Sequence, residues 1–254
     1  MNPLFSAIGR GLANYLSKPR PGYERLSRTS LQEVMDVLQP GDILLVDGNS
    51  RISTAIKYLT QSTWSHACLF VGASKCDPDE PSLIEADLTQ GVIMVPLSKY
   101  EQYNVRICRP VGISDTTRDT IINFARERLG HVYDLRNIFD LARYLIQKPA
   151  VPNRLRRELI TFGSGEPTRA ICSTLIAEAF LSVGYPILPE FIRVEDRKGQ
   201  QVTIQRHYTH YVPGDFDLSP NFRIVKPTLE RGFSFEKLRQ SMARDVEFDE
   251  VSQS

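Results

Sequence analysis

The sequence predicts an α+β fold in which an antiparallel sheet packs against helices. Several apolar runs of strand length follow one another with short loops between them, which favours antiparallel pairing. Two longer runs, 116–129 and 171–183, carry apolar residues at helical spacing. The chain has 254 residues, of which 41% are hydrophobic and 24% are charged, so it is long enough to bury a sizeable core.

The first half of the chain is predicted to alternate short helices with strands. A helix near 31–38 begins with a capping box, in which Ser30 is the cap and Glu33 follows three residues later. Another helix is expected at 50–59. Strands of one meander-like sheet are expected at 42–46, 66–71, 82–87, 91–95 and 103–109.

The second half is predicted to hold the two main helices. Ser114 caps the helix at 116–129, and Gly130 ends it. The apolar helix at 171–183 ends at Gly184, the segment 212–215 is predicted to be a turn, and 222–225 is a candidate last strand. The domain prediction is an N-terminal amphipathic extension at 1–30, a catalytic domain at 31–228 with an insertion at about 135–169, and a polar tail at 229–254.

Charge and composition exclude several classes of function. The net charge is +1, from 31 basic and 30 acidic side chains, and such a balance gives no electrostatic case for nucleic-acid binding. The four cysteines form no C-x-x-C pair, and Cys68 and Cys108 are interpreted as small strand or core residues. His207 and His210 form an H-x-x-H pair without a supporting ligand cluster. We therefore expect no metal and no cofactor.

The N-terminal stretch leaves two interpretations open. Its apolar residues lie at near-helical spacing over residues 4–16, which fits a helix on a membrane surface or a helix docked on the protein's own body. It lacks the apolar core of a secretory signal, and no stretch reaches the roughly 18 apolar residues of a membrane span. We expect a cytoplasmic protein, with peripheral membrane contact through this helix as the alternative.

Cys172 is the candidate nucleophile because it stands at the opening of an apolar helix. The free backbone N–H groups and the dipole of a helix N-terminus stabilise a thiolate there. The same N–H groups can hold an oxyanion after the sulfur attacks a carbonyl. The alternative is an ordinary buried cysteine.

His66 is the candidate base, because it stands at the polar start of an apolar strand and would project from a rigid element. An imidazole base needs an orienting partner on its far nitrogen. Glu85 lies inside the otherwise apolar run 83–86 on the next strand, and it is the best candidate for this partner. Asp87 is on the same face by the two-residue period and is the reserve.

The order of these fragments along the chain resembles the permuted NlpC-type papain-like hydrolases. The branch it resembles is the bacterial YiiX/YaeF group, whose wider kin include lecithin–retinol acyltransferase-like enzymes. The resemblance covers roughly residues 38–226 and rests on Gly41-Asp42, Ser65-His66-Ala67, Ile84-Glu85-Ala86, Gly91-Val92, Tyr133-Asp134 and Cys172-Ser173. It implies a circularly permuted papain-like fold, in which a partly barrel-like antiparallel sheet packs on the helix that bears the nucleophile.

The resemblance also implies roles for individual residues. Cys172 matches the nucleophile, His66 the base and Glu85 the polar third member, while Tyr133 resembles a tyrosine that lines the site. The neighbours of the dyad, Ser65 and Ser173, are assigned with Tyr133 to substrate binding, and Asp42 is interpreted as a turn or strand-start device.

The expected function is hydrolysis of an amide or ester carbonyl through a thioester intermediate. A lipid acyltransferase or phospholipase-like enzyme with the same residues is one alternative, and a non-enzymatic cleft-binding module is the other. The substrate is left open between a small molecule, a peptide, a peptidoglycan fragment and an acyl lipid. The insertion at about 135–169, with its Arg154–Arg157 cluster, is a candidate lid.

Overall fold

The computed structural model describes residues 11, 15, 17–19, 22–25, 29–73, 81–87, 90–131, 171–188, 192–195, 201–204, 208 and 211–230. The predicted insertion at 135–169, nearly all of the predicted tail and most of the N-terminal extension lie outside these residues, as do Tyr133, His207 and His210. Within the described ranges, no helix has the length and apolar character that a bilayer crossing requires.

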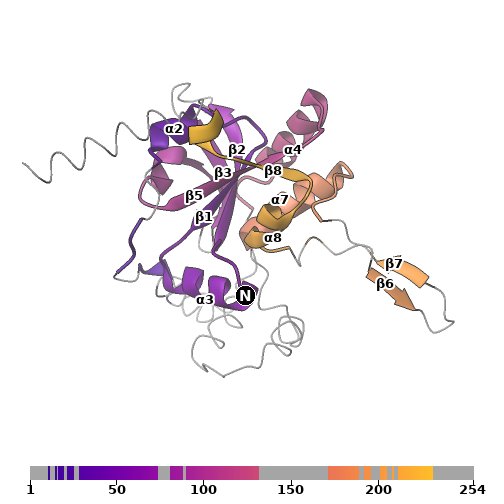
Figure 1. The fold of residues 1–254 in the computed structure, drawn as a ribbon, viewed down its shortest axis with the longest axis horizontal. Helices are drawn as coiled ribbons and strands as arrows, with labels where there is room; N and C mark the ends of the chain where they lie inside the picture. The colour runs from indigo at the N-terminus through magenta and orange to yellow at the C-terminus, as the bar shows by residue number, and fades with distance from the viewer. Residues whose placement is uncertain are drawn as a thin grey trace, which may run out of the picture.

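The centre of the molecule is a six-stranded sheet in which all neighbouring strands run antiparallel (Figure 1). The strand order is β4-β3-β2-β1-β5-β8, so the sequence-adjacent strands β1 to β4 pair as a meander and β5 returns to the far side of β1. All five expected strands and the candidate last strand are present. They are β1 (Ile43–Asp47), β2 (His66–Ala73), β3 (Pro81–Asp87), β4 (Gly91–Pro96), β5 (Asn104–Pro110) and β8 (Phe222–Val225).

Three helices begin at serine caps, and two of these caps, Ser30 and Ser114, were predicted from the sequence. Ser30 and Glu33 form the capping box, and Ser50 and Ser114 each accept a hydrogen bond from the backbone N–H three residues on. The helical elements are α2 (Leu31–Met35), α3 (Arg51–Thr60), η1 (Leu97–Tyr100), α4 (Asp115–Glu127), α7 (Ile171–Ser182), α8 (Pro213–Leu218) and α9 (Pro227–Glu230). Together with the sheet they make the α+β fold that the sequence predicted.

Two segments differ from the prediction. Residues 212–215 were expected to form a turn, but they begin α8, because Pro213 fits the first helical position and Asp215 accepts a hydrogen bond from the Val212 N–H at 2.8 Å. The sequence of segment 191–210 is mixed and did not predict a particular element there. The segment contains a hairpin of β6 (Ile192–Glu195) and β7 (Gln201–Ile204), which pair with each other rather than with the main sheet.

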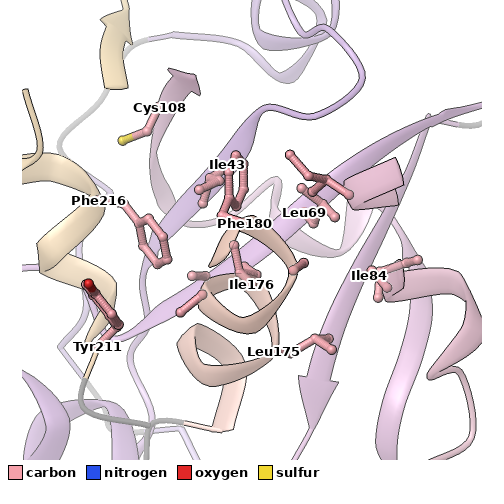
Figure 2. Packing of buried hydrophobic residues seen from close by; sticks show 14 of the residues in the cluster. Ile43, Leu69, Ile84, Cys108, Leu175, Ile176, Phe180, Tyr211 and Phe216 are labelled. Carbon is pink, nitrogen blue, oxygen red and sulfur yellow. The ribbon is translucent and has the colours of Figure 1, made fainter. Parts of the chain in front are cut away.

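Apolar side chains cover both faces of the sheet, which explains why its strands are near-continuous apolar runs. One face packs against α4 and α7, and the other packs against α2 and η1. Helix α7 is buried around most of its circumference, because the sheet lies on one side of it and α4 and Phe216 of α8 lie on others. Figure 2 shows Ile176 and Phe180 of α7 directed toward the strands that carry Ile43 and Leu69.

A buried ion pair joins the start of β1 to β5. Asp42 is 1% exposed and accepts hydrogen bonds from Arg109 Nε at 2.8 Å and Nη2 at 2.7 Å. It also accepts one from the Gln39 N–H at 2.8 Å, so it holds the turn that leads into β1. Asp42 therefore has the structural contacts that the strand-start interpretation requires.

Replacing Asp42 with Ala is expected to lower the free energy of unfolding by about 3 kcal/mol, because the largely buried Arg109 guanidinium loses its counter-ion. Urea unfolding at neutral pH measures this loss. Asp115→Ala is the matched control, since Asp115 pairs with Arg118 at 2.6 Å but is 86% exposed, and its loss should be small. Equal losses in the two variants would contradict the structural role of Asp42.

Candidate active site

Three elements bring the predicted catalytic residues together. His66 is the first residue of β2, Glu85 lies in β3, and Cys172 is the second residue of α7. The strands pair with Leu69 opposite Ile84, so Cys68 lies opposite Glu85 and His66 shares their face by the two-residue period. The Nε2 atom of His66 is 3.1 Å from Oε2 of Glu85.

Cys172 approaches His66 from the helical layer. Helix α7 packs on the face of the sheet that carries Ala67 and Leu69, whereas Cys68 belongs to the opposite face. Because His66 stands at the very start of β2, its ring lies at the end of the sheet, where the first turn of α7 reaches it. The Cys172 thiol lies close enough to the His66 ring to raise its pKa, and Cys172 is 5% exposed. The first N–H groups of a helix have no partner within the helix, so α7 offers donors beside this thiol.

The Glu85 carboxylate lies in a pocket of hydrogen-bond donors and is itself 1% exposed. The Lys99 ammonium donates to Oε1, and the Tyr100 hydroxyl donates to Oε2, the oxygen that also faces His66. Burial on its own would raise the pKa of Glu85, but His66 and Lys99 outweigh burial and hold this pKa well below its usual range. Glu85 is therefore ionised at neutral pH and can accept hydrogen bonds but not donate them.

An acceptor-only Glu85 determines which nitrogen of His66 carries a proton. Nε2 must donate to the carboxylate, which leaves Nδ1 to exchange a proton with another partner. Burial would lower the pKa of His66, but the Cys68 and Cys172 thiols beside it outweigh burial and hold this pKa well above its usual value. The arrangement therefore favours the protonated form of the His66 ring.

Cys68 is a second thiol in this site, although sequence analysis interpreted it as a strand residue. It is fully buried, as expected, and its Sγ lies 3.5 Å from Oε2 of Glu85 and 3.4 Å from the Tyr100 hydroxyl. Burial raises the pKa of Cys68, and the Glu85 charge raises it further, while His66 lowers it. The two-residue spacing indicates that Cys68 shares a face with His66, but its contact with Glu85 depends on the pairing of β2 with β3.

Lys99 and Tyr100 were missed by the sequence analysis. They belong to η1, a single 3-10 turn that follows β4, and β4 pairs with β3 so that Ile93 lies opposite Glu85. The pairing of β4 with β3 therefore places η1 next to the Glu85 carboxylate. Nothing in the local sequence around Lys99 and Tyr100 specifies that contact.

The donor set of the site could hold a metal ion. One ligand atom each from His66, Cys68 and Glu85 lies within 4.8 Å of the other two, and nitrogen, sulfur and oxygen are ordinary zinc ligands. A cation there would compete with the Lys99 ammonium for the charge of Glu85. The charge of the carboxylate is already balanced by protein groups.

The remaining predicted residues have other contacts. Ser65 Oγ accepts a hydrogen bond from the Gly48 N–H at 3.0 Å, and Ser173 Oγ donates one to the Tyr211 carbonyl at 2.7 Å. Both serines are buried, and their substrate-binding role stays a prediction, as does that of Tyr133, which lies outside the described residues. Asp87, the reserve for Glu85, accepts a hydrogen bond from the Gln90 N–H at 3.0 Å.

Comparison with protein families gave a match over part of the chain. Residues 37–144 match the model of the permuted papain-like amidase enzymes of the YaeF/YiiX, C92 family. This segment is similar to that family. The predicted α+β fold of permuted papain-like type and the predicted hydrolase of amidase type are thereby confirmed. The matched segment contains His66 and Glu85 and ends before Cys172.

Two further comparisons were made. The chain is similar to the crystal structure of the metalloprotein yiiX from Escherichia coli O157:H7, with a TM-score of 0.46 and 17% sequence identity, over 74% of this chain and 96% of that chain. A comparison with curated proteins gave no match.

Acid is expected to destabilise the protein through Glu85. Because the pKa of Glu85 in the folded state lies well below the ordinary value of 4.5, its ionised form contributes stability that is fully present above that value and is lost as the pH falls below it. Urea unfolding between about pH 7 and pH 3 should show a smaller acid-induced loss in Glu85→Gln than in the wild type. The same slope in both proteins would show that the charge of Glu85 does not support the fold.

Proposed function

We propose that this protein is a cysteine amidase in which Cys172 attacks an amide or ester carbonyl and His66 acts as its general base. The observation that carries the proposal is the position of the His66 ring. Glu85 engages its Nε2 atom, and the thiol at the start of α7 lies close to the same ring. The ring of the base thus lies between an orienting carboxylate and a nucleophile, which is the arrangement that nucleophilic catalysis requires.

The reaction follows from these contacts in two halves. The Cys172 thiol transfers its proton to Nδ1 of His66, and the thiolate attacks the carbonyl carbon. The oxyanion that forms is stabilised by backbone N–H groups in the first turn of α7. His66 then protonates the leaving amine or alcohol, which departs and leaves a thioester. Water attacks the thioester while His66 takes its proton, and the acid product leaves with the thiol restored.

Glu85 contributes to both halves without itself changing protonation. Its charge stabilises the imidazolium that His66 becomes, and its fixed acceptor position keeps Nε2 protonated and Nδ1 directed toward Cys172. Because Glu85 is buried beneath the ring, water does not weaken this interaction.

Cys172 is favoured over Cys68 as the nucleophile, although both thiols lie close to His66 and raise its pKa. Cys68 is 0% exposed and lies against the Glu85 carboxylate, which repels a thiolate. Cys172 stands at a helix start, where the helix dipole and the free N–H groups favour a negative sulfur.

The assignment predicts selective alkylation. Iodoacetamide at neutral pH should modify Cys172 of the intact chain first, and His66→Ala should slow this modification by about 100-fold, because general-base assistance is lost. Peptide mass spectrometry identifies the modified cysteine. Cys108→Ser is the matched control, since Cys108 is buried in β5 and should not affect the rate at Cys172. Equal modification of Cys68, or a rate that ignores His66, would sink the proposal.

Changing the carboxylate to an amide tests the third residue. In Glu85→Gln the carbonyl oxygen can accept from Lys99, so the amide N–H groups face His66 and force the ring proton onto Nδ1. The alkylation rate of Cys172 should fall by about 100-fold or more, as for other triads with the wrong tautomer.

Asp87→Asn is the control for this experiment, because it makes the same chemical change on the same strand. It should leave the rate near that of the wild type. A larger effect of Asp87→Asn than of Glu85→Gln would assign the orienting role to Asp87.

A further inference from the structure

We propose that Lys99 and Tyr100 are positioning residues of this amidase, which act through Glu85 to fix the tautomer of His66 and the pH range in which Cys172 reacts. The inference rests on the proposed function. Neither residue touches Cys172 in the described contacts, and both bind the carboxylate on which His66 depends.

The first argument is the saturation of the Glu85 carboxylate. A carboxylate offers about four lone-pair sites. Lys99 occupies Oε1, while Tyr100, His66 and the Cys68 thiol share Oε2. All four contacts run from a donor to the carboxylate, so a proton on Glu85 would set a donor against a donor and displace at least one of them. The pocket therefore accepts Glu85 in one protonation state and one orientation.

The second argument is electrostatic. A carboxylate that is 1% exposed would bind a proton if no cation stood beside it. Lys99 supplies that cation independently of His66. Its side chain is 39% exposed, so the ammonium group stays partly hydrated while it binds Glu85. Glu85 can thus stay ionised while His66 is neutral, which is the state in which His66 must act as a base.

The third argument is that Tyr100 is built into the wall of the site. It is 5% exposed, and its ring centroid lies 6.1 Å from that of His66 and 6.1 Å from that of Tyr103. Its hydroxyl bonds Glu85 and lies 3.4 Å from the Cys68 sulfur. Burial raises the pKa of Tyr100 well above its usual value, and the Cys68 and Glu85 charges raise it further, so the hydroxyl stays a donor.

The titratable groups that face His66 and Glu85 within the described residues come from three elements. They are Cys68 from β2, Lys99 and Tyr100 from η1, and Cys172 from α7. Among these groups, Lys99 has the side chain that is positively charged throughout the neutral pH range. Removing its charge therefore makes the site more negative. A thiolate at Cys172 is then less stable, and a higher pH is needed to form it.

The test is the pH profile of Cys172 alkylation by iodoacetamide in the full chain, with peptide mass spectrometry as the readout. Lys99→Met should move the acidic limb of the profile to higher pH by about 0.5 to 1 unit, and Lys99→Arg should restore it because it keeps the charge. Tyr100→Phe should lower the maximal rate by about 10-fold, since Glu85 loses a donor that fixes its orientation.

Each variant has a matched control. Lys57→Met removes a lysine that pairs with Asp47 at 2.6 Å rather than with Glu85, and Tyr103→Phe removes the hydroxyl of the neighbouring tyrosine. Both controls should keep the wild-type profile. Thermal melts check that every variant is folded. If Tyr100→Phe does not fold, the Lys99→Met and Lys99→Arg profiles test the positioning role, because the Lys99 side chain is partly exposed.

The outcomes separate this inference from the proposed function. Wild-type profiles in Lys99→Met and Tyr100→Phe, together with a strong effect of His66→Ala, would overturn the positioning role and leave the amidase assignment standing. A wild-type Cys172 whose alkylation does not depend on His66 would overturn the amidase assignment itself. A shift in Lys99→Met that Lys99→Arg reverses supports the positioning role, because a merely structural lysine would not move the pH profile.

Discussion

The hydrogen bond between His66 and the buried Glu85 carboxylate is the interaction on which the site depends. A carboxylate inside a sheet is tolerated when donors surround it, and here a lysine, a tyrosine, a histidine and a thiol do so. Because Glu85 stays ionised, the proton of His66 is placed on Nε2, and Nδ1 is left for Cys172. The proposed chemistry of the nucleophile therefore depends on a buried acid on β3, the strand next to β2.

The two covered faces of the sheet explain how the site is assembled. Glu85 and Cys68 face the layer that contains η1, whereas Cys172 comes from the layer of α7 on the opposite face. His66 can meet both because it is the first residue of β2, at the end of the sheet. A histidine two residues further along the same strand would face the η1 layer alone, enclosed by the core.

Local signals in the sequence predicted most of the elements and the three residues at the centre of the site. Periodicity and caps located the strands and the main helices, since these signals are local. The helix start at Cys172 and the acid in the apolar run around Glu85 are local signals too. The start of α8 was mistaken for a turn, because Pro-Gly punctuation is shared by turns and by first helical turns.

The sequence by itself determined the types of element, and it predicted the permuted order of base before nucleophile and the residues proposed to carry chemistry. The tertiary structure decided how they are coupled. Pairing of β4 with β3 brings Lys99 and Tyr100 of η1 to Glu85, and the two-sided burial of β2 makes Cys68 part of the site. These contacts depend on register and on packing between strands, and neither is encoded in the few residues around each partner, so no local pattern could reveal them.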